Sequence, residues 1–414
     1  MIVVAGAGPA GIAAAVRARE SGADVTIVDD NASPGGQIWR GQQDSKWFRR
    51  LRDAGPALIQ RGQIVSGDAS IRTLLVETPE RAFELRYDEL ILATGARELF
   101  LPFPGWTLPG VMGVGGLQAM AKSGLPLRGK RILVAGSGPL LLAGACYFRE
   151  RGAHVLRIAE QASRAALIGF ALRLARHPGK LAQAARLRFG LPMVPVQTDC
   201  RVERAEGGTR VEEVHLRQGN RTFAERIDYA AIGWGLRPNT QLAALLGCAA
   251  DSSGVRVDES QRTSVRRVYA AGECTGVGGV DLSLIEGEIA GLAAAGEFSA
   301  AGALLRRREQ ARHFGQLLAE TFALREDLRD LPQTDTIVCR CEDVSFGQLR
   351  AHASFRAAKL HTRCGMGPCQ GRICGGAAEF LFGWKDESVR PPVLPARIGS
   401  FVVGGGDGGT EPVG

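Results

Sequence analysis

The sequence lacks long apolar runs and has few aromatic residues. No stretch reaches the roughly 18 consecutive apolar residues of a membrane span, and the N-terminus shows no basic region or cleavage site of a secretory signal peptide. We therefore predict a cytoplasmic protein without a transmembrane segment. Aromatic residues make up 6% of the chain, and no nucleic-acid-binding motif accompanies the net charge of +8. No nucleic-acid partner is predicted, and the arginine-rich stretches are interpreted as a solvated basic face or a docking face for an acidic subunit.

Recognisable catalytic side chains are also missing. The six histidines do not pair at catalytic or ligand spacing, and residues 1–330 contain no two cysteines at the spacing of a redox dithiol. No catalytic residue is predicted. Two residue types are abundant instead: the 55 glycines are about twice the usual share of roughly 7%, and five of the nine cysteines crowd between Cys339 and Cys374. In a reducing compartment, such a crowd indicates metal binding or redox chemistry rather than structural disulfides.

The N-terminal residues, which begin MIVVAGAGPAG, have the pattern of a dinucleotide-binding strand–helix–strand unit. Gly6 permits the tight turn, Gly8 lets the backbone approach a pyrophosphate at the helix N-terminus, and Gly11 lets the helix pack closely on the strand. Asp29, at the end of the second strand, is placed to accept a hydrogen bond from a ribose hydroxyl. The neighbouring residues expected at the same ligand are Pro9, Ala10 and Asp30.

The same pattern returns in RILVAGSGPLLLAGACYFRERGAHVLRIAE, from Arg131 to Glu160. Aligned without a gap, the first two glycines and the proline are kept. Leu141 stands at the third glycine position, and Ala159 stands at the acidic position, although Glu160 follows directly and is able to substitute. We therefore predict a second nucleotide-binding fold, and leave open whether it holds a second nucleotide, ATP or NAD(H).

Three further segments complete a recognisable order. They are PGGQIW from Pro34 to Trp39, the strand end Ala93-Thr94-Gly95, and Gly272-Glu273 after a late strand. With the two fingerprints, this order resembles the flavoproteins of the glutathione reductase and thioredoxin reductase superfamily over roughly residues 1–300. The resemblance implies an α/β fold with two Rossmann-like dinucleotide-binding domains and FAD at the first fingerprint. It also implies cofactor contacts at Gly36, Gln37, Ala93, Thr94, Gly95, Gly272 and Glu273.

The order of the segments predicts the domain organisation. A split FAD domain is expected at 1–125 and 225–300, with the second nucleotide-binding-like domain inserted at 126–224. Residues 301–332 are predicted as a helical linker, 333–385 as a small helical domain that carries the cysteines, and 386–414 as a C-terminal tail. The apolar, turn-rich stretch around Trp106 is either a pocket lining, a subunit interface or a buried connection.

The cysteine segment, residues 333–385, reads VCRCED and further on TRCGMGPCQGRIC. Four thiolates hold either a [2Fe-2S] cluster or a structural zinc ion, and the Cys339-x-Cys341 pair is less usual for zinc sites, which generally use CxxC pairs. Cys364-x4-Cys369 and Cys369-x4-Cys374 have the same spacing, so spacing leaves the last ligand open. The glycines of this segment are expected to let backbone N–H groups approach sulfur, and Arg340, Arg363 and Arg372 to offset negative charge.

The cysteine segment resembles the [2Fe-2S] domain of bacterioferritin-associated ferredoxin, and more closely the version fused to flavoproteins. That resemblance implies Cys339, Cys341, Cys369 and Cys374 as ligands, with Cys364 as a bystander.

Nearly the whole chain resembles the α, or A, subunits of heteromeric amine-oxidising dehydrogenases, such as D-hydroxyproline and proline dehydrogenases, opine oxidase and hydrogen cyanide synthase. The resemblance implies that a β-type FAD-dependent subunit oxidises an amino or imino acid and that this chain relays the electrons. A small γ iron–sulfur subunit is a further implied partner. Two alternatives remain: a self-sufficient NAD(P)H-dependent FAD and iron–sulfur oxidoreductase, and a non-catalytic scaffold that holds zinc.

Overall fold

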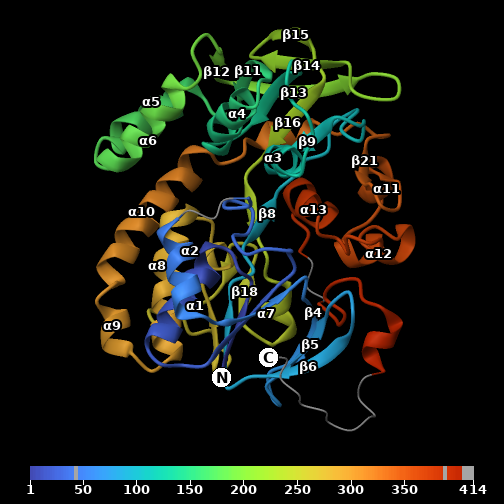
Figure 1. The fold of residues 1–414 in the computed structure, drawn as a ribbon. Helices are drawn as coiled ribbons and strands as arrows, with labels where there is room; N and C mark the ends of the chain where they lie inside the picture. The colour runs from blue at the N-terminus through green and yellow to red at the C-terminus, as the bar shows by residue number, and fades with distance from the viewer. Residues whose placement is uncertain (42–44, 386–388, 403–414) are drawn as a thin grey trace. The chain divides into compact units, whose positions relative to one another are not determined.

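The computed structural model describes residues 1–41, 45–385 and 389–402 (Figure 1). The chain forms two compact units, and each unit combines segments that are far apart in the sequence. The first unit consists of Met1–Gly95, Pro238–Glu309 and the described part of Ser388–Gly414. The second consists of Ala96–Arg237 and the described part of Gln310–Glu387.

The first unit is built on a five-stranded sheet with the order β20-β7-β1-β2-β3, in which every pair is parallel. The strands are β1 (Ile2–Ala5), β2 (Val25–Asp29), β3 (Ala57–Gln60), β7 (Glu89–Leu92) and β20 (Val268–Ala270). Every residue of β1 and β2 is buried. Continuous burial is typical of a parallel sheet that is covered on both faces.

Helix α1 (Pro9–Glu20) packs on one face of this sheet and against α8 (Gly279–Ala294). The two helices meet backbone to backbone at Gly287 and Gly291 of α8, where an added Cβ would overlap a carbonyl oxygen of α1. The alanine-rich buried side of α1 fits the same close approach. This packing fixes where α1 begins relative to the ends of β1 and β7.

The other elements of the first unit surround the parallel sheet. Strands β4 (Gln63–Asp68), β5 (Thr73–Glu77) and β6 (Ala82–Arg86) form an antiparallel sheet. The remaining elements are α2 (Lys46–Ala54), α7 (Gln241–Leu245), β18 (Ala250–Asp251), β19 (Gly254–Val255), η1 (Glu273–Thr275), α9 (Phe298–Gly302) and η3 (Ile398–Phe401). Of the tail predicted at 386–414, only residues 389–402 are described. There, Arg397 donates to the carbonyl oxygen of Pro79 over 3.0 Å.

The second unit repeats this plan. A parallel sheet has the order β12-β11-β10-β16-β9, and β13, β14 and β15 form an antiparallel sheet. The strands are β9 (Val111–Gly113), β10 (Arg131–Gly136), β11 (His154–Glu160), β12 (Val196–Gln197), β13 (Cys200–Glu206), β14 (Glu213–Gln218), β15 (Arg221–Arg226) and β16 (Tyr229–Gly233). The helices are α3 (Val114–Lys122), α4 (Leu140–Glu150), α5 (Arg164–Leu174) and α6 (Pro178–Phe189). A short pair, β8 (Ala96–Glu98) and β17 (Leu236–Pro238), completes the strands of this part.

The cysteine segment belongs to the second unit and has its own small core. The chain reaches it through α10 (Leu305–Thr321) and η2 (Glu326–Asp330). Its elements are β21 (Ile337–Cys339), β22 (Val344–Ser345), α11 (Phe346–Arg350), α12 (Phe355–Thr362) and α13 (Cys374–Phe382). Trp106 is buried, and its indole N–H donates to the carbonyl oxygen of Ile337 over 2.6 Å. The stretch around Trp106 is therefore a buried connection that supports the start of β21.

The predicted fold class is confirmed, with two Rossmann-like domains and a small helical C-terminal segment. The compact units differ from the predicted domain bounds, because β9 and β16 lie outside 126–224 and still belong to the second parallel sheet. Strand pairing between distant segments is invisible to local sequence patterns. Among the described residues, no helix combines the length and apolar character needed to cross a membrane.

Candidate cofactor sites

The first fingerprint, Gly6, Gly8 and Gly11, lies where β1 ends and α1 begins. Two of its glycines are needed by the protein itself: a Cβ on Gly6 would overlap the carbonyl oxygen of Ala93, and a Cβ on Gly11 would overlap that of Gly6. Gly8 differs, because a Cβ there meets no protein atom within 4 Å. Gly8 is also the N-cap of α1, with an ordinary φ of −74°. Open space at this position is what a bound pyrophosphate requires.

The other predicted segments converge on the same helix end. A Cβ on Gly36 would lie 3.0 Å from the Cα of Gly8, and a Cβ on Gly272 would lie 2.6 Å from the Cβ of Ala10. Ala93, buried at the end of β7, packs beneath Gly6. Segments that lie far apart in the sequence therefore form one cradle around the start of α1, as a dinucleotide site in this fold requires.

The two predicted acids beside this cradle are placed differently. Asp29 is buried, and one of its carboxylate oxygens accepts from the backbone N–H of Ala7. The other oxygen accepts from the backbone N–H of Asn31 over 2.7 Å. Asp30 and Gln37 are exposed. Asp29 thus braces the fingerprint loop at the position of a ribose-binding acid.

Sequence reasoning missed Glu286, which shapes the late part of the cradle. Its buried carboxylate accepts from the backbone N–H of Gly272 over 3.1 Å and from the Thr275 hydroxyl over 2.8 Å. Gly272 itself has a φ of 80°, which favours glycine. Burial raises the pKa of the adjacent Glu273. An acidic residue in the largely apolar helix α8 was a signal in the sequence, but no local pattern connects Glu286 with Gly272.

The remaining predicted residues lie at the end of β7. The hydroxyl of Thr94 donates to the carbonyl oxygen of Asn239 over 2.8 Å, and the side-chain amide of Asn239 donates back to the Thr94 carbonyl over 2.9 Å. Gly95 has a φ of 65°. These bonds hold the Ala93–Gly95 turn in place within the first unit.

The second unit contains a β-bulge that changes the comparison of the two fingerprints. The register between β10 and β11 shifts after Ile132, so Gly136 pairs with Glu160 rather than with Ala159. Glu160 therefore takes the structural position of Asp29, and the gap-free alignment that put Ala159 there is corrected. Its carboxylate accepts from the N–H groups of Gly138 and Ala162, each over 2.8 Å. Burial raises the pKa of Glu160 to about 7.

The phosphate-binding part of the second fingerprint is altered and covered. Helix α4 starts at Leu140, one residue later than the counterpart of α1, and Gly138 has a φ of 98°. The ring of Phe322 lies where a ligand would approach, 3.8 Å from a Cβ placed on Gly138. The Ser137 hydroxyl donates to the Phe322 carbonyl over 3.0 Å, and the Gln161 amide donates to the Ala323 carbonyl over 3.0 Å. Phe322 and Ala323 thus contact groups of the second fingerprint that a bound nucleotide would otherwise contact.

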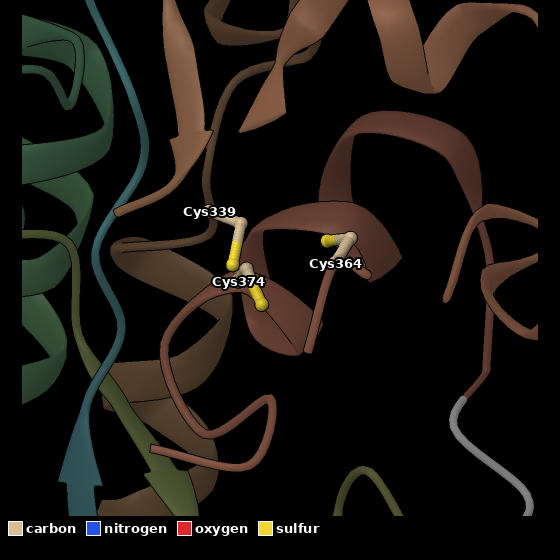
Figure 2. A group of neighbouring side chains, drawn as sticks. All are labelled: Cys339, Cys364 and Cys374. Atoms are coloured by element: carbon tan, nitrogen blue, oxygen red, sulfur yellow. The ribbon is translucent and has the colours of Figure 1, made fainter. Parts of the chain in front are cut away.

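Three thiols of the cysteine segment gather in its core. Cys339, Cys364 and Cys374 are all buried, and their sulfur atoms lie within 4.8 Å of one another (Figure 2). Cys339 ends β21, Cys374 begins α13, and Cys364 follows α12. The structure therefore brings Cys364, the predicted bystander, beside two of the predicted ligands.

The other two predicted ligands adjoin this group. Cys369 is within hydrogen-bond reach of Cys374 and of Cys341. Cys374 contacts Cys339, Cys364 and Cys369, and Cys369 also contacts Cys341, so the five thiols form one connected group. A Cβ on Gly367 would overlap the Cβ of Cys341, so this position needs glycine. A [2Fe-2S] cluster takes two thiolates on each iron, and four of these five thiols would meet that requirement.

Without a cation, these thiols cannot all ionise together. Hydrogen bonds from Cys364 and Cys374 hold the pKa of Cys339 well below the ordinary thiol range. The hydrogen bond to Cys339 raises the pKa of Cys364 to about 12. The backbone N–H groups of Gly365 and Gly371 also donate to Cys339 and Cys369, respectively. A bound metal centre would release the remaining protons and compensate the negative charge.

The sequence matches known proteins over most of its length. The family described as pyridine nucleotide-disulphide oxidoreductase matches residues 1–295. The chain is 33% identical to the A subunit of opine oxidase from Rhizobium meliloti (strain 1021), over 96% of this chain and 97% of that protein. It is 30% identical to hydrogen cyanide synthase subunit HcnB of Pseudomonas aeruginosa, over 90% of each chain.

Solved structures share the fold. L-proline dehydrogenase from P. horikoshii superposes with a TM-score of 0.68 at 18% identity, over 96% of this chain and 78% of that chain. Lactococcus lactis thioredoxin reductase superposes with a TM-score of 0.55 at 17% identity, over 74% of this chain and 99% of that chain.

Replacing Gly8 with valine should abolish flavin binding without unfolding the protein. The added side chain meets no protein atom but fills the space for the pyrophosphate. Visible absorbance and released flavin, measured on purified protein, should fall to below about a tenth of the wild-type content. The matched control is Gly302→Val, because Gly302 lies in the same unit with similar open space. A full complement of FAD in Gly8→Val would contradict the placement.

NADH and NADPH should not reduce the bound flavin at catalytic speed. Leu141 replaces the third glycine, and Phe322 covers Gly138. Stopped-flow mixing of purified protein with either nucleotide should show no flavin bleaching within seconds, while dithionite bleaches the same sample. Rapid bleaching by NADH would show that the second fingerprint is productive. Inert binding of an adenine nucleotide would leave this prediction intact.

Proposed function

The chain belongs to the pyridine nucleotide-disulphide oxidoreductase family and is a flavin-dependent oxidoreductase, and on this premise we propose that it is the electron-relaying subunit of a heteromeric dehydrogenase. The complex would act on amino or imino acids of the D-hydroxyproline, proline, opine or glycine type. This subunit would hold FAD at the first fingerprint and a [2Fe-2S] cluster on Cys339, Cys341, Cys369 and Cys374. Its partners would be a β-type FAD-dependent flavoprotein and, in some complexes, a small γ iron–sulfur subunit.

One observation carries this proposal: a single chain combines an open dinucleotide cradle with a buried group of thiols. When bound, a flavin exchanges electrons in pairs or singly, and a [2Fe-2S] cluster exchanges them one at a time. The chain's residues position these groups. Asp29 and Gly8 define the nucleotide side of the flavin site, while Gly365 and Gly371 direct backbone N–H groups at sulfur.

The assignment to a multisubunit enzyme is supported by the relatives. The opine oxidase and hydrogen cyanide synthase relatives are both named as subunits, and this chain covers 97% and 90% of their lengths. The substrate side of the reaction is assigned to the partner, because the described residues around the flavin cradle include no recognisable pair of catalytic carboxylates and no amino-acid clamp.

One observation favours the alternative of an NAD(P)H-dependent oxidoreductase. The β-bulge in β11 restores an acid, Glu160, at the ribose position of the second fingerprint. The contacts of Phe322 and Ala323 weigh against it, because they occupy the phosphate side of that fingerprint.

Replacing Cys364 or Cys374 with serine, one at a time, should show which of the two is the fourth cluster ligand. Cys374→Ser should lose the visible [2Fe-2S] spectrum and its iron, because Cys374 contacts Cys339 and Cys369, two of the other predicted ligands. Cys364→Ser should keep the spectrum. Iron and sulfide analysis of wild-type protein should give two of each per chain. The reverse pattern for the two variants would exchange the assignments, and one zinc per chain without iron would contradict the cluster.

The purified chain should not oxidise an amine substrate by itself. Protein with full FAD and iron should give less than about a hundredth of the rate of the complex when assayed with D-hydroxyproline, proline, sarcosine, glycine or an opine and an artificial dye. Activity should appear when a β-type flavoprotein subunit is co-expressed. Turnover by the isolated chain would mean that the substrate site lies in this subunit.

A further inference from the structure

Two arginines that lie far from the cysteines in the sequence contact the cysteine segment. Arg97 belongs to β8, and its Nε donates to the carbonyl oxygen of Arg372 over 2.9 Å. Arg237 belongs to β17, the strand that pairs with β8, and forms an ion pair with Glu379 of α13. All four residues lie in the second unit. The dinucleotide fold of that unit therefore supplies cations to the thiol-bearing segment.

These contacts lead directly to two predicted cluster ligands. Arg372 donates to the carbonyl oxygen of Cys369 over 3.3 Å, so Arg97 holds the loop that positions Cys369. Helix α13 begins at Cys374, and Arg237 holds the same helix through Glu379. Gly376 lets α13 approach Leu99 and Arg237 closely, because a Cβ at this position would lie 3.0 Å from the Cδ1 of Leu99 and 3.4 Å from the Cδ of Arg237.

The guanidinium groups of Arg97, Arg237 and Arg372 lie close together and form a concentrated positive charge. Burial is the main cause that lowers the pKa of Arg97 to about 10, and the nearby charges of Arg237 and Arg372 add to it. Arg97 still carries its charge at neutral pH. One contact of Arg97 is with the backbone carbonyl of Arg372, and Arg237 forms an ion pair with Glu379. Gathering like charges away from water is unfavourable unless an anion lies close by.

On the basis of the proposed [2Fe-2S] site, we propose that Arg97, with Arg237 and its partner Glu379, sets the redox potential of the cluster. Reduction adds one electron, and therefore one negative charge, to a centre that already carries four thiolates. A partly buried cation near Cys369 stabilises the reduced form more than the oxidised form and raises the potential. An anion at Glu379 has the opposite effect.

Two charge-changing variants should shift the potential in opposite directions. Arg97→Gln removes the cation and should lower the midpoint potential, whereas Glu379→Gln removes the anion and should raise it. We expect each change to alter the ratio of reduced to oxidised cluster by about tenfold at a fixed potential, which is 59 mV for a one-electron couple. The measurement is a dithionite titration followed by electron paramagnetic resonance, with iron content determined on each sample.

Two controls separate charge from geometry. Arg97→Lys keeps the cation and should remain close to wild type. Arg363→Gln removes an arginine of the ligand-bearing loop itself, but Arg363 is exposed and paired with Glu342 over 2.8 Å, so solvent screens its charge. Its potential should also stay close to that of wild type.

The outcomes distinguish this inference from the proposed function. Wild-type protein without iron would overturn both. Iron-loaded Arg97→Gln and Glu379→Gln proteins with unchanged potentials, or with shifts of the same sign, would overturn the inference alone. A loss of iron in Arg97→Gln leaves the decision to Glu379→Gln, whose unchanged or lowered potential would refute it and whose raised potential would support it.

Discussion

Backbone-to-backbone packing at the start of α1 is the constraint on which the first unit depends. Gly6 lies against Ala93, Gly11 lies against Gly6, and Gly287 brings α8 onto Ala10. A side chain at any of these positions would overlap a carbonyl oxygen, and overpacking of this kind costs about 1–3 kcal/mol or more. The same packing brings the ends of β1, β7 and β20 together, because each feeds a loop that passes this helix end. A cradle for a dinucleotide follows from the packing, with Gly8 as the glycine whose space the protein leaves open.

The second unit shows what the same fold does when that constraint is relaxed. Leu141 replaces the third glycine and is buried in the core, and helix α4 begins one residue late. The loop compensates through Gly138, which adopts a left-handed conformation instead of serving as an extended N-cap. The β-bulge then returns an acid to the ribose position. The unit thus keeps the strand order and the acid of a nucleotide-binding domain, while Phe322 occupies the phosphate side.

Local patterns in the sequence predicted the features that depend on neighbouring residues. The fingerprint, the two strand–helix–strand units and the crowding of thiols are of this kind, because glycine spacing and buried strands leave a direct signature. The register shift that moves Glu160 into place was not predictable, since one extra residue in β11 is visible only against its partner strand. The role of Glu286 was missed, and the choice among the alternatives for the Trp106 stretch stayed open, because each depends on a contact with a distant segment. The fourth cluster ligand stays a prediction, with Cys364 beside Cys339 and Cys374.

Strand β8 connects several of these features. It follows the Ala93–Gly95 turn directly and carries both Arg97 and Glu98. The half-buried Glu98 carboxylate accepts from the backbone N–H groups of Gly115 and Gly116 over 2.8 and 2.9 Å, at the start of α3. The glycine run there is needed because a Cβ on Gly113 would overlap the carboxylate. An anion at a helix N-terminus is favourable, so Glu98 anchors β8. With the strand anchored, Arg97 is held beside the cysteine loop, and a charge that must lie close to the ligands in space is supplied by a strand far from them in sequence.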